Sequence, residues 1–517
     1  MPPKPMPQWA SVIAILLMAG CSRLLYSTMY DDYYDDSFIT FRYAQNIADG
    51  KGFVYNEHES VYGASSPLYT WVSVVLRSAF GSSYLPVVAR WFGTLSLFAC
   101  GLLIYCYVGL VPMARNIMLM ILLSYPRIFY SSIGGMEECF ILMLMALSIA
   151  GVVRRSSVLL GVSVGLLLVT KVDTIVWIAC LACVSFFRRQ PSLCRSMIIA
   201  LGVSLPWIVF SLFEFGTLVP HTILAKQIAY AHEPSFRIVD AFLLAVPDGL
   251  RGQSVMVGLF ALMWYSIIVL TLWSIVRRKD WLYLVFPLYC VAYTCALLFS
   301  GTSIGLWARW TVPLWGCLVF CIGYLVHVFS PWLDRMGVSQ LGWKGGIGIF
   351  VLYVLLLALP FVYPNRSAMA LSSHKLVADW FDRNAGVGES IMLEPIGLIG
   401  YRSGLYVHDF IGLVSTQVTD ARIRAGGSNR WFMKYLSEHH PTYVMLRVDE
   451  LRMNEFYVGG YGDSIFAGQE RTWFESRFDS VFQTASGPAV DRFILFKSRS
   501  AADGNTRLGD QRAERLF

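Results

Sequence analysis

The sequence has 517 residues, of which 56% are hydrophobic and only 15% are charged, and its mean hydropathy is +0.55. A soluble domain carries about 25% charged residues, so this composition excludes an ordinary soluble domain and indicates a polytopic membrane protein. The net charge of +7 does not indicate a nucleic-acid-binding protein, because the basic residues cluster in short stretches between apolar segments, at Arg154–Arg155, Arg188–Arg189 and Arg277–Lys279.

Apolar segments alternate with short polar stretches over residues 1–365. Several are shorter than the roughly 20 residues that a straight span needs, and we predict an α-helical domain with about 11–13 membrane segments. Three apolar segments lie between residues 67 and 133, but the chain must begin and end this stretch on the same side of the membrane, which requires an even number of crossings. One of the three, with the short segment 67–80 as the first candidate, is therefore expected to re-enter the membrane or to lie along its interface. The segments fall near residues 9–30, 67–80, 86–110, 117–133, 138–153, 157–170, 174–187, 196–213, 255–276, 281–300, 310–329 and 346–363.

Charge distribution predicts the orientation of these segments. If the basic clusters are cytoplasmic, several polar loops and all residues after 364 share the external face of the membrane. These loops are 31–66, 134–138, 171–173, 214–254 and 301–309. The interpretation is a multi-pass membrane protein whose polar loops lie together on the side opposite the cytoplasm.

Beyond Pro364 the charged residues become frequent and the apolar runs become short. Residues 372–385 and 430–440 have helical patterns, and we predict strands near residues 390–394, 405–411, 442–448 and 493–497. This alternation predicts an external α/β domain over residues 366–499, followed by a polar, disordered tail over 500–517.

The loop 31–66 is the most residue-specific part of the chain and contains four aspartates within six positions. Asp35 and Asp36 open a segment with helical spacing, where the helix dipole favours ionised carboxylates. Ionised carboxylates outside the bilayer suit a general base for a hydroxyl nucleophile. Capping of a helix would explain one aspartate but not two consecutive ones, so we interpret Asp35 and Asp36 as catalytic, and Asp31 and Asp32 as solvated loop charges.

The stretch that begins with Asp35 resembles the first external loop of bacterial GT-C glycosyltransferases. The matching features are the run DDSFITFRYAQN at 35–46, the pattern Gly-x-Gly-x-Val-x-Asn at 50–56, and a glutamate followed by Gly-x-Ser at 59–65. Within these enzymes, the stretch is most similar to the group that contains the mycobacterial terminal β-arabinofuranosyltransferases.

Later motifs extend the resemblance along most of the membrane portion and into the external domain. Lys171-Val172 stands where the family has Arg-Pro, His221 stands where it has Asn, and His408 precedes Asp409 where it has an apolar residue. The matching motifs are Gly134–Glu137, Lys171–Asp173, Gly216 with Pro220–Lys226, Arg309 with Pro313, and Gly397, Gly400–Tyr401 and His408–Leu413.

The resemblance implies an inverting glycosyltransferase that uses a polyprenyl-phosphate-linked sugar, with arabinofuranose as the first candidate sugar and a cell-envelope glycan, lipid or protein as acceptor. It implies Asp35 as the base, Asp36 as its orienting neighbour and Glu137 as a second carboxylate. Lys226 and Arg309 are expected to stabilise the anionic phosphate leaving group. The full set of predicted donor-phosphate and substrate-binding residues is Arg42, Lys171, Asp173, His221, Lys226 and Arg309.

Two other classes of function remain open from the residues alone: a transporter or flippase of lipid-linked saccharides, and a non-catalytic membrane scaffold. A transporter would need ionisable residues along a path through the bundle, whereas here they gather in loops on one side. No dedicated metal cage is evident, although two adjacent aspartates could recruit a divalent cation. No cofactor is therefore assigned.

Overall fold

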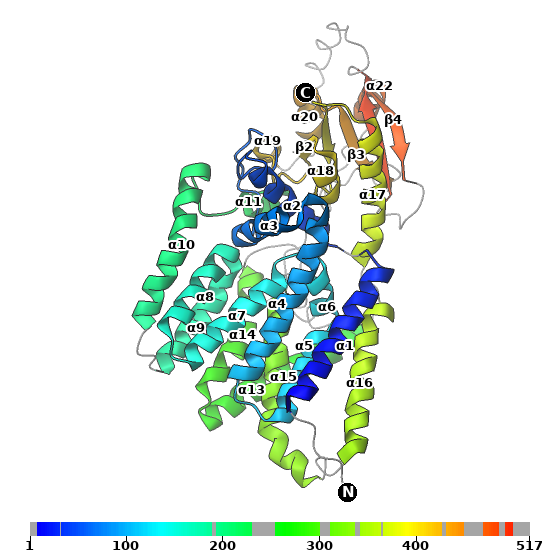
Figure 1. Ribbon diagram of the computed structural model, residues 1–517. Coiled ribbons are helices and arrows are strands. Elements are labelled where there is room, and N and C mark those ends of the chain that lie inside the picture. The colour runs from blue at the N-terminus through cyan, green and yellow to red at the C-terminus, as the bar shows by residue number, and fades with distance from the viewer. Residues whose placement is uncertain are drawn as a thin grey trace.

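The computed structural model describes residues 8–31, 33–188, 193–229, 254–299, 311–336, 342–362, 366–426, 431–448, 469–484 and 492–499. A long bundle of apolar helices forms the lower part of the molecule, and a small α/β domain lies at one end of it (Figure 1). The bundle helices are α1 (Gln8–Met29), α4 (Leu85–Tyr107), α5 (Pro112–Ser124), α6 (Pro126–Ile133), α7 (Glu138–Val153), α8 (Ser157–Thr170), α9 (Ile175–Phe187), α10 (Leu193–Phe215), α13 (Ser254–Arg278), α14 (Val285–Phe299), α15 (Val312–Arg335) and α16 (Gly342–Val362).

The bundle has the length and composition of a multi-pass membrane protein. Among the described residues, five helices are long and apolar enough to cross a membrane, or six if α6 and α7, which meet at 107°, count as one bent span. Further apolar helices are shorter, such as α5 and α8. The predicted polytopic α-helical class is confirmed, with several segments shorter than a straight span.

The predicted single segment 117–133 is wrong, because the chain breaks there into α5 and α6. Tyr125 between them is extended (φ −60°, ψ 122°), and Pro126 occupies the first turn of α6. A proline disfavours helical geometry in the residue before it and cannot donate the next helical hydrogen bond. The sequence contains this proline, but the apolar run on both sides concealed the break.

The path of the chain between residues 67 and 133 explains how it returns to its starting side. Helix α3 (Pro67–Phe80) lies at the end of the bundle beside α2 (Asp35–Ala48), and α4 then runs away from that end (Figure 1). Helices α5 and α6 bring the chain back, since Tyr34 N–H donates to Gly134 O at 3.1 Å. Segment 67–80 therefore adds no pass through the bundle.

The C-terminal domain contains a five-stranded sheet of order β2-β1-β3-β5-β4. The first three strands in this order are parallel, while β5 is antiparallel to β3 and to β4. Four strands lie where the sequence predicts them; β4 was missed, because it is an exposed edge strand without an apolar run. The strands are β1 (Ser390–Leu393), β2 (Tyr406–Asp409), β3 (Tyr443–Arg447), β4 (Phe478–Gln483) and β5 (Phe493–Ser498).

Both faces of this sheet are covered, as the alternation of side chains along each strand requires. Ile391 and Leu393 of β1 pack on one face, and Met392 packs on the other. The second face holds the side chains of α19 and α20, including Phe432 and Leu436. The helices of the domain are α17 (Arg366–Asn384), α18 (Gly397–Ser403), α19 (Thr416–Arg424), α20 (Trp431–His439) and α22 (Gln469–Arg477).

The first face is completed by the loop that precedes α3. Tyr43, Phe53 and Tyr55 belong to the same buried cluster as Val407 and Leu495 of the sheet. Residues more than 340 positions apart thus share one core. The first loop is consequently part of the core of the C-terminal domain.

Candidate functional site

Asp35 begins α2, and its carboxylate lies against the start of α18. Oδ2 accepts a hydrogen bond from Gly397 N–H at 2.8 Å, and Oδ1 accepts one from Leu398 N–H at 3.0 Å. His374 Nδ1 on α17 lies 3.0 Å from Oδ1. A Cβ at Gly397 would lie 1.9 Å from Asp35 O, so only glycine allows this approach. Asp35 therefore acts as a cap for amides that a helix start leaves without intrahelical partners.

Arg42 lies two turns further along α2 and is buried. Its guanidinium donates to the carbonyl oxygens of Tyr55 at 2.8 Å, Gly400 at 2.6 Å and Leu405 at 2.7 Å. It also stacks over the Tyr55 ring, 4.2 Å from the centroid. This geometry favours a structural role for Arg42, joining the first loop to the C-terminal domain, over the phosphate contact that the sequence predicts.

Asn56 of the same loop pairs with the edge of the sheet. Its amide nitrogen donates to Val407 O at 2.9 Å, and its oxygen accepts from Val407 N–H at 3.0 Å. An edge strand otherwise exposes such groups to any other chain. The loop therefore covers β2 as well as capping α18.

Glu137 lies in the turn that connects α6 to α7, residues 134–138, which we call the α6–α7 turn. It is only 1% exposed, and its Oε1 lies 2.8 Å from Lys171 Nζ, in the turn between α8 and α9. Tyr293 of α14 donates to Asp173 Oδ2 at 3.2 Å in the same turn. The structure thus brings three of the predicted residues, from two separate loops, into one charged cluster.

Burial and neighbouring charges act in opposite directions in this cluster. Burial alone would lower the pKa of Lys171, but Glu137 and Asp173 outweigh it and raise that pKa, so the ammonium stays charged. Burial raises the pKa of Asp173, which Lys171 partly offsets. The cluster presents a fixed positive charge between carboxylates.

The α6–α7 turn also supports the start of α2. Tyr34 N–H donates to Gly134 O at 3.1 Å, and Tyr69 of α3 donates to Gly135 O at 2.9 Å. A Cβ at Gly135 would lie 3.2 Å from Ser37 Oγ, and the φ of Gly135 is +80°, a conformation that favours glycine. The carboxylates of the first loop and the Glu137 cluster accordingly lie at the same end of the bundle.

His221 begins α11 (His221–Ala229) and contacts both the first loop and the C-terminal domain. Its backbone N–H donates to Tyr62 O at 2.8 Å, and its ring atom Nε2 lies 3.0 Å from Thr419 Oγ1 on α19. Burial lowers the pKa of His221, which favours the neutral ring. Lys226 lies further along the same helix and is partly buried. Arg309 and Asp32 lie outside the described residues.

Asp31, interpreted above as a solvated loop charge, is 58% exposed and also joins two helices. Its carboxylate lies 3.3 Å from Arg90 of α4 and also pairs with Lys375 of α17. The Arg90 guanidinium lies over the Tyr33 ring, 4.0 Å from the centroid. Sequence reasoning missed Arg90, His374 and Lys375, because single polar residues in helices carry no motif.

Arg23 was also missed and is fully buried in the middle of α1. It donates to Ser132 Oγ at 2.8 Å, Ala19 O at 3.2 Å and Leu123 O at 3.0 Å. Leu123 lies at the end of α5, where the break before Pro126 releases carbonyl groups from helical hydrogen bonding. An arginine within an apolar run was the available signal.

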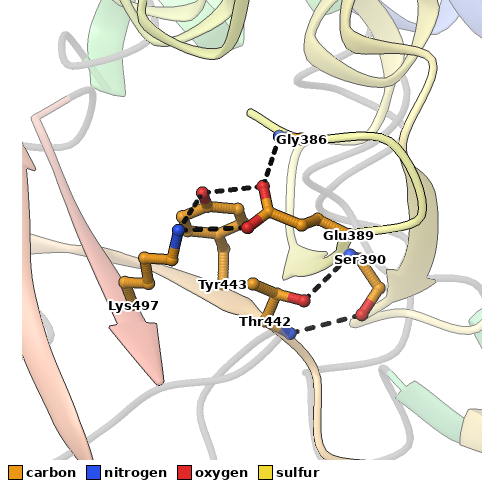
Figure 2. Close-up of polar contacts among 6 residues, drawn as sticks. All are labelled: Gly386, Glu389, Ser390, Thr442, Tyr443 and Lys497. Atoms are coloured by element: carbon orange, nitrogen blue, oxygen red, sulfur yellow. Dashed lines mark hydrogen bonds and ion pairs between the residues drawn. The ribbon is translucent and has the colours of Figure 1, made fainter. Parts of the chain in front are cut away.

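A separate polar cluster lies at the amino ends of the parallel strands (Figure 2). Glu389 accepts from Gly386 N–H at 2.6 Å, Tyr443 at 2.9 Å and Lys497 at 3.0 Å. Burial would raise the pKa of Glu389, but these three hydrogen bonds outweigh it and lower that pKa. The cluster ties the loop after α17 to β3 and β5, at the opposite strand ends from Asp35.

Across the residues with described positions, no group of three or more His, Cys, Asp or Glu side chains could hold a metal ion. The site instead offers carboxylates, a buried lysine and backbone amides. Such a set can accept a proton from a hydroxyl and can neutralise an anionic leaving group.

Comparisons with known proteins place the fold. A model of a domain of unknown function, DUF8728, matches residues 365–491. No curated protein matches the sequence. Two crystal structures of ArnT from Cupriavidus metallidurans are similar to this chain, and each alignment covers 96% of this chain and 99% of the ArnT chain. The structure bound to undecaprenyl phosphate aligns with 14% sequence identity and a TM-score of 0.54. The structure in the apo state aligns with 13% identity and a TM-score of 0.56. The chain therefore has the GT-C membrane fold of these structures, with a sheet-containing domain at its C-terminal end.

Proposed function

We propose that this protein is an inverting glycosyltransferase that moves a sugar from a polyprenyl-phosphate donor to a hydroxyl of a cell-envelope glycan, lipid or protein. The observation that carries the proposal is that the first loop packs on the α6–α7 turn, so its carboxylates and the buried Glu137–Lys171 pair lie at the same end of a GT-C bundle. The ArnT structure bound to undecaprenyl phosphate supports a polyprenyl-phosphate partner for this fold. The resemblance of the loop that begins at Asp35 makes arabinofuranose the first sugar to test.

The reaction needs one base and one stabilised leaving group. A first-loop carboxylate takes the proton of the acceptor hydroxyl as its oxygen attacks the anomeric carbon from the face opposite the phosphate. The bond between the anomeric carbon and the phosphate oxygen breaks, and the polyprenyl phosphate leaves with the electron pair. The products are the glycosylated acceptor, with inverted configuration, and polyprenyl phosphate.

The cationic side chains have distinct places in this scheme. Lys226 and Arg309 are proposed to neutralise the phosphate, as the sequence predicts. Lys171, paired with Glu137 and close to Asp173, is proposed to fix hydroxyl groups of the donor sugar between charges of both signs. His221, neutral and bound to Thr419, is proposed to border the site on the domain side.

Orientation is part of the proposal. We place the protein in a bacterial inner membrane with the C-terminal domain in the periplasm or outside the cell. The basic clusters at the opposite ends of the helices support this orientation by the positive-inside rule.

Mass spectrometry of cell-envelope glycans, with and without the gene, tests the proposal directly. We expect loss of the gene to remove one sugar from a glycan. We expect Glu137→Gln, which removes the carboxylate that holds Lys171, to reduce the restoration of that sugar about 100-fold. Purified protein in lipid nanodiscs should bind undecaprenyl phosphate in native mass spectrometry. Unchanged glycans together with no lipid binding would refute the function.

A further inference from the structure

We infer that Tyr69 of α3 is a positioning residue for the transfer reaction: its hydroxyl holds the α6–α7 turn in place and thereby sets the position of Glu137. The inference rests on the proposed function, because Tyr69 acts on the reaction only through Glu137. Tyr69 is not among the site residues predicted from the sequence.

The end of α6 and the α6–α7 turn are held by their backbone. The carbonyl oxygens of residues 132–135 each accept a hydrogen bond from another segment of the chain. In the order of the carbonyls, the donors are Thr94 Oγ1 at 3.1 Å, Arg90 Nε at 3.3 Å, Tyr34 N–H at 3.1 Å and the Tyr69 hydroxyl at 2.9 Å. Carbonyl groups at the end of a helix lack intrahelical donors, so these contacts both satisfy them and fix the turn.

Tyr69 provides the contact from α3. Its side chain is fully buried, and its ring centre lies 6.2 Å from that of Phe92 on α4 and 6.5 Å from that of Phe140 on α7. Burial and the neighbouring charge of Glu137 raise the pKa of Tyr69, so the hydroxyl keeps its proton and remains a donor to Gly135 O. The packed ring therefore fixes the point to which the turn is attached.

The turn carries Glu137 two residues after the carbonyl that Tyr69 binds. Glu137 Oε1 lies 2.8 Å from Lys171 Nζ. Helix α2 packs on the same turn, since a Cβ at Gly135 would lie 3.2 Å from Ser37 Oγ and 3.3 Å from Phe41 Cζ. A shift of the turn would consequently move Glu137 relative to both the first loop and the α8–α9 turn.

The expected effect on the reaction follows from the number of contacts. A displacement of about 1 Å in an active site can cost about 100-fold in rate. Loss of the Tyr69 hydroxyl removes one of the four donors described above and leaves three, so the turn should loosen rather than detach. We therefore expect a loss of about 10-fold in the transfer rate.

A double-mutant cycle in a strain without the gene tests the inference. The measured quantity is the initial rate at which each full-length variant, after induction, restores the missing sugar, divided by the amount of protein in the membrane. Tyr69→Phe keeps the buried ring and should lower this rate about 10-fold. In the Glu137→Gln background the same substitution should lower it by less than about 2-fold, because the group that Tyr69 positions is already lost.

Tyr353→Phe is the matched control. Tyr353 of α16 is 1% exposed, and its hydroxyl donates to Ile15 O of α1 at 3.0 Å, so the control also removes a buried hydrogen bond between two helices. It should restore the sugar at the wild-type rate. Amide hydrogen exchange on the purified protein in nanodiscs adds a measurement that needs no activity: the Tyr34 amide, which donates to Gly134 O, should exchange about 10-fold faster in Tyr69→Phe and unchanged in Tyr353→Phe.

A wild-type rate in Tyr69→Phe would overturn the inference. So would an equal loss in the wild-type and Glu137→Gln backgrounds, because Tyr69 would then act independently of Glu137. If loss of the gene leaves the glycans unchanged and the protein binds no undecaprenyl phosphate, the proposed function fails and the role of Tyr69 in transfer fails with it. Exchange at the Tyr34 amide then still decides whether the Tyr69 hydroxyl holds the turn.

Discussion

Arg42→Met is the sharpest test of how the first loop is joined to the C-terminal domain. The guanidinium binds three carbonyl oxygens within 2.8 Å, and two of them keep a second donor after its loss. Tyr55 O also accepts from Asn46 at 2.9 Å, and Gly400 O accepts from the N–H of Gly404, the residue directly after α18, at 3.3 Å. Leu405 O is therefore the carbonyl oxygen for which the loss of the Arg42 hydrogen bond costs most.

The size of the effect follows from these contacts. A buried carbonyl that loses its donor costs about 1–3 kcal/mol, and a desolvated stacking contact such as that with Tyr55 contributes about 1–2 kcal/mol. Burying the guanidinium itself costs free energy, and its removal offsets part of the sum. The free energy needed to open the contact between the loop and the domain should therefore fall by about 2–4 kcal/mol. Local opening of the loop–domain contact should therefore be about 30- to 700-fold more frequent.

Hydrogen exchange of residues 397–405 measures that opening, with Arg77→Met as the control. Arg77 pairs with Asp49 at 2.6 Å on the partly exposed side of α3, so its loss should cost less than about 1 kcal/mol. Wild-type exchange in Arg42→Met, combined with loss of undecaprenyl phosphate binding, would refute the structural role. It would support the phosphate contact that the sequence predicts.

Two further predictions concern buried charges. Lys171→Met removes the ammonium that lies 2.8 Å from the buried Glu137 carboxylate and should lower the free energy of unfolding by about 3–5 kcal/mol. The double variant with Glu137→Gln should recover most of this stability in thermal unfolding, and equal destabilisation of the single and double variants would contradict the pairing. Burial lowers the pKa of His408 to about 4 and raises that of Asp409 to about 6. His408 binds its proton less readily in the folded than in the unfolded state, so it lowers the free energy of unfolding by about 3 kcal/mol as the pH falls from about 6.5 to 4. Asp409 holds its proton more tightly in the folded state, so it lowers the free energy of unfolding by a similar amount as the pH rises from about 4 to 6. The wild-type melting temperature should therefore vary little between pH 4 and 6.5, whereas that of His408→Asn should rise as the pH falls, and a flat profile for this variant would contradict the assignment.

Much of the fold was predictable because it follows from local pattern. The apolar runs predict the bundle helices, and the strand-like runs near residues 390–394 and 442–448 predict β1 and β3. The break at Tyr125 and the edge strand β4 were not predicted, since hydropathy outweighs a single proline in the first case and polar residues interrupt the apolar run in the second. The candidate site was predictable only as a set of loops on one side.

The partners of each side chain depended on contacts between distant parts of the chain. Nothing local distinguishes Asp35 from Asp36, yet residues more than 330 positions away bind the first of them. A similar separation along the chain divides Arg42 from Gly400 and Leu405, two of the three residues whose carbonyl oxygens it binds.

The sequence by itself determined that this is a membrane bundle with a C-terminal α/β domain and an acidic first loop, because hydropathy and charge act locally along the chain. Only the tertiary structure decided that the first loop belongs to the core of that domain, and that Asp35 caps α18. The reason is physical: a carboxylate takes its role from the donors that surround it, and folding brings those donors from residues 374, 397 and 398.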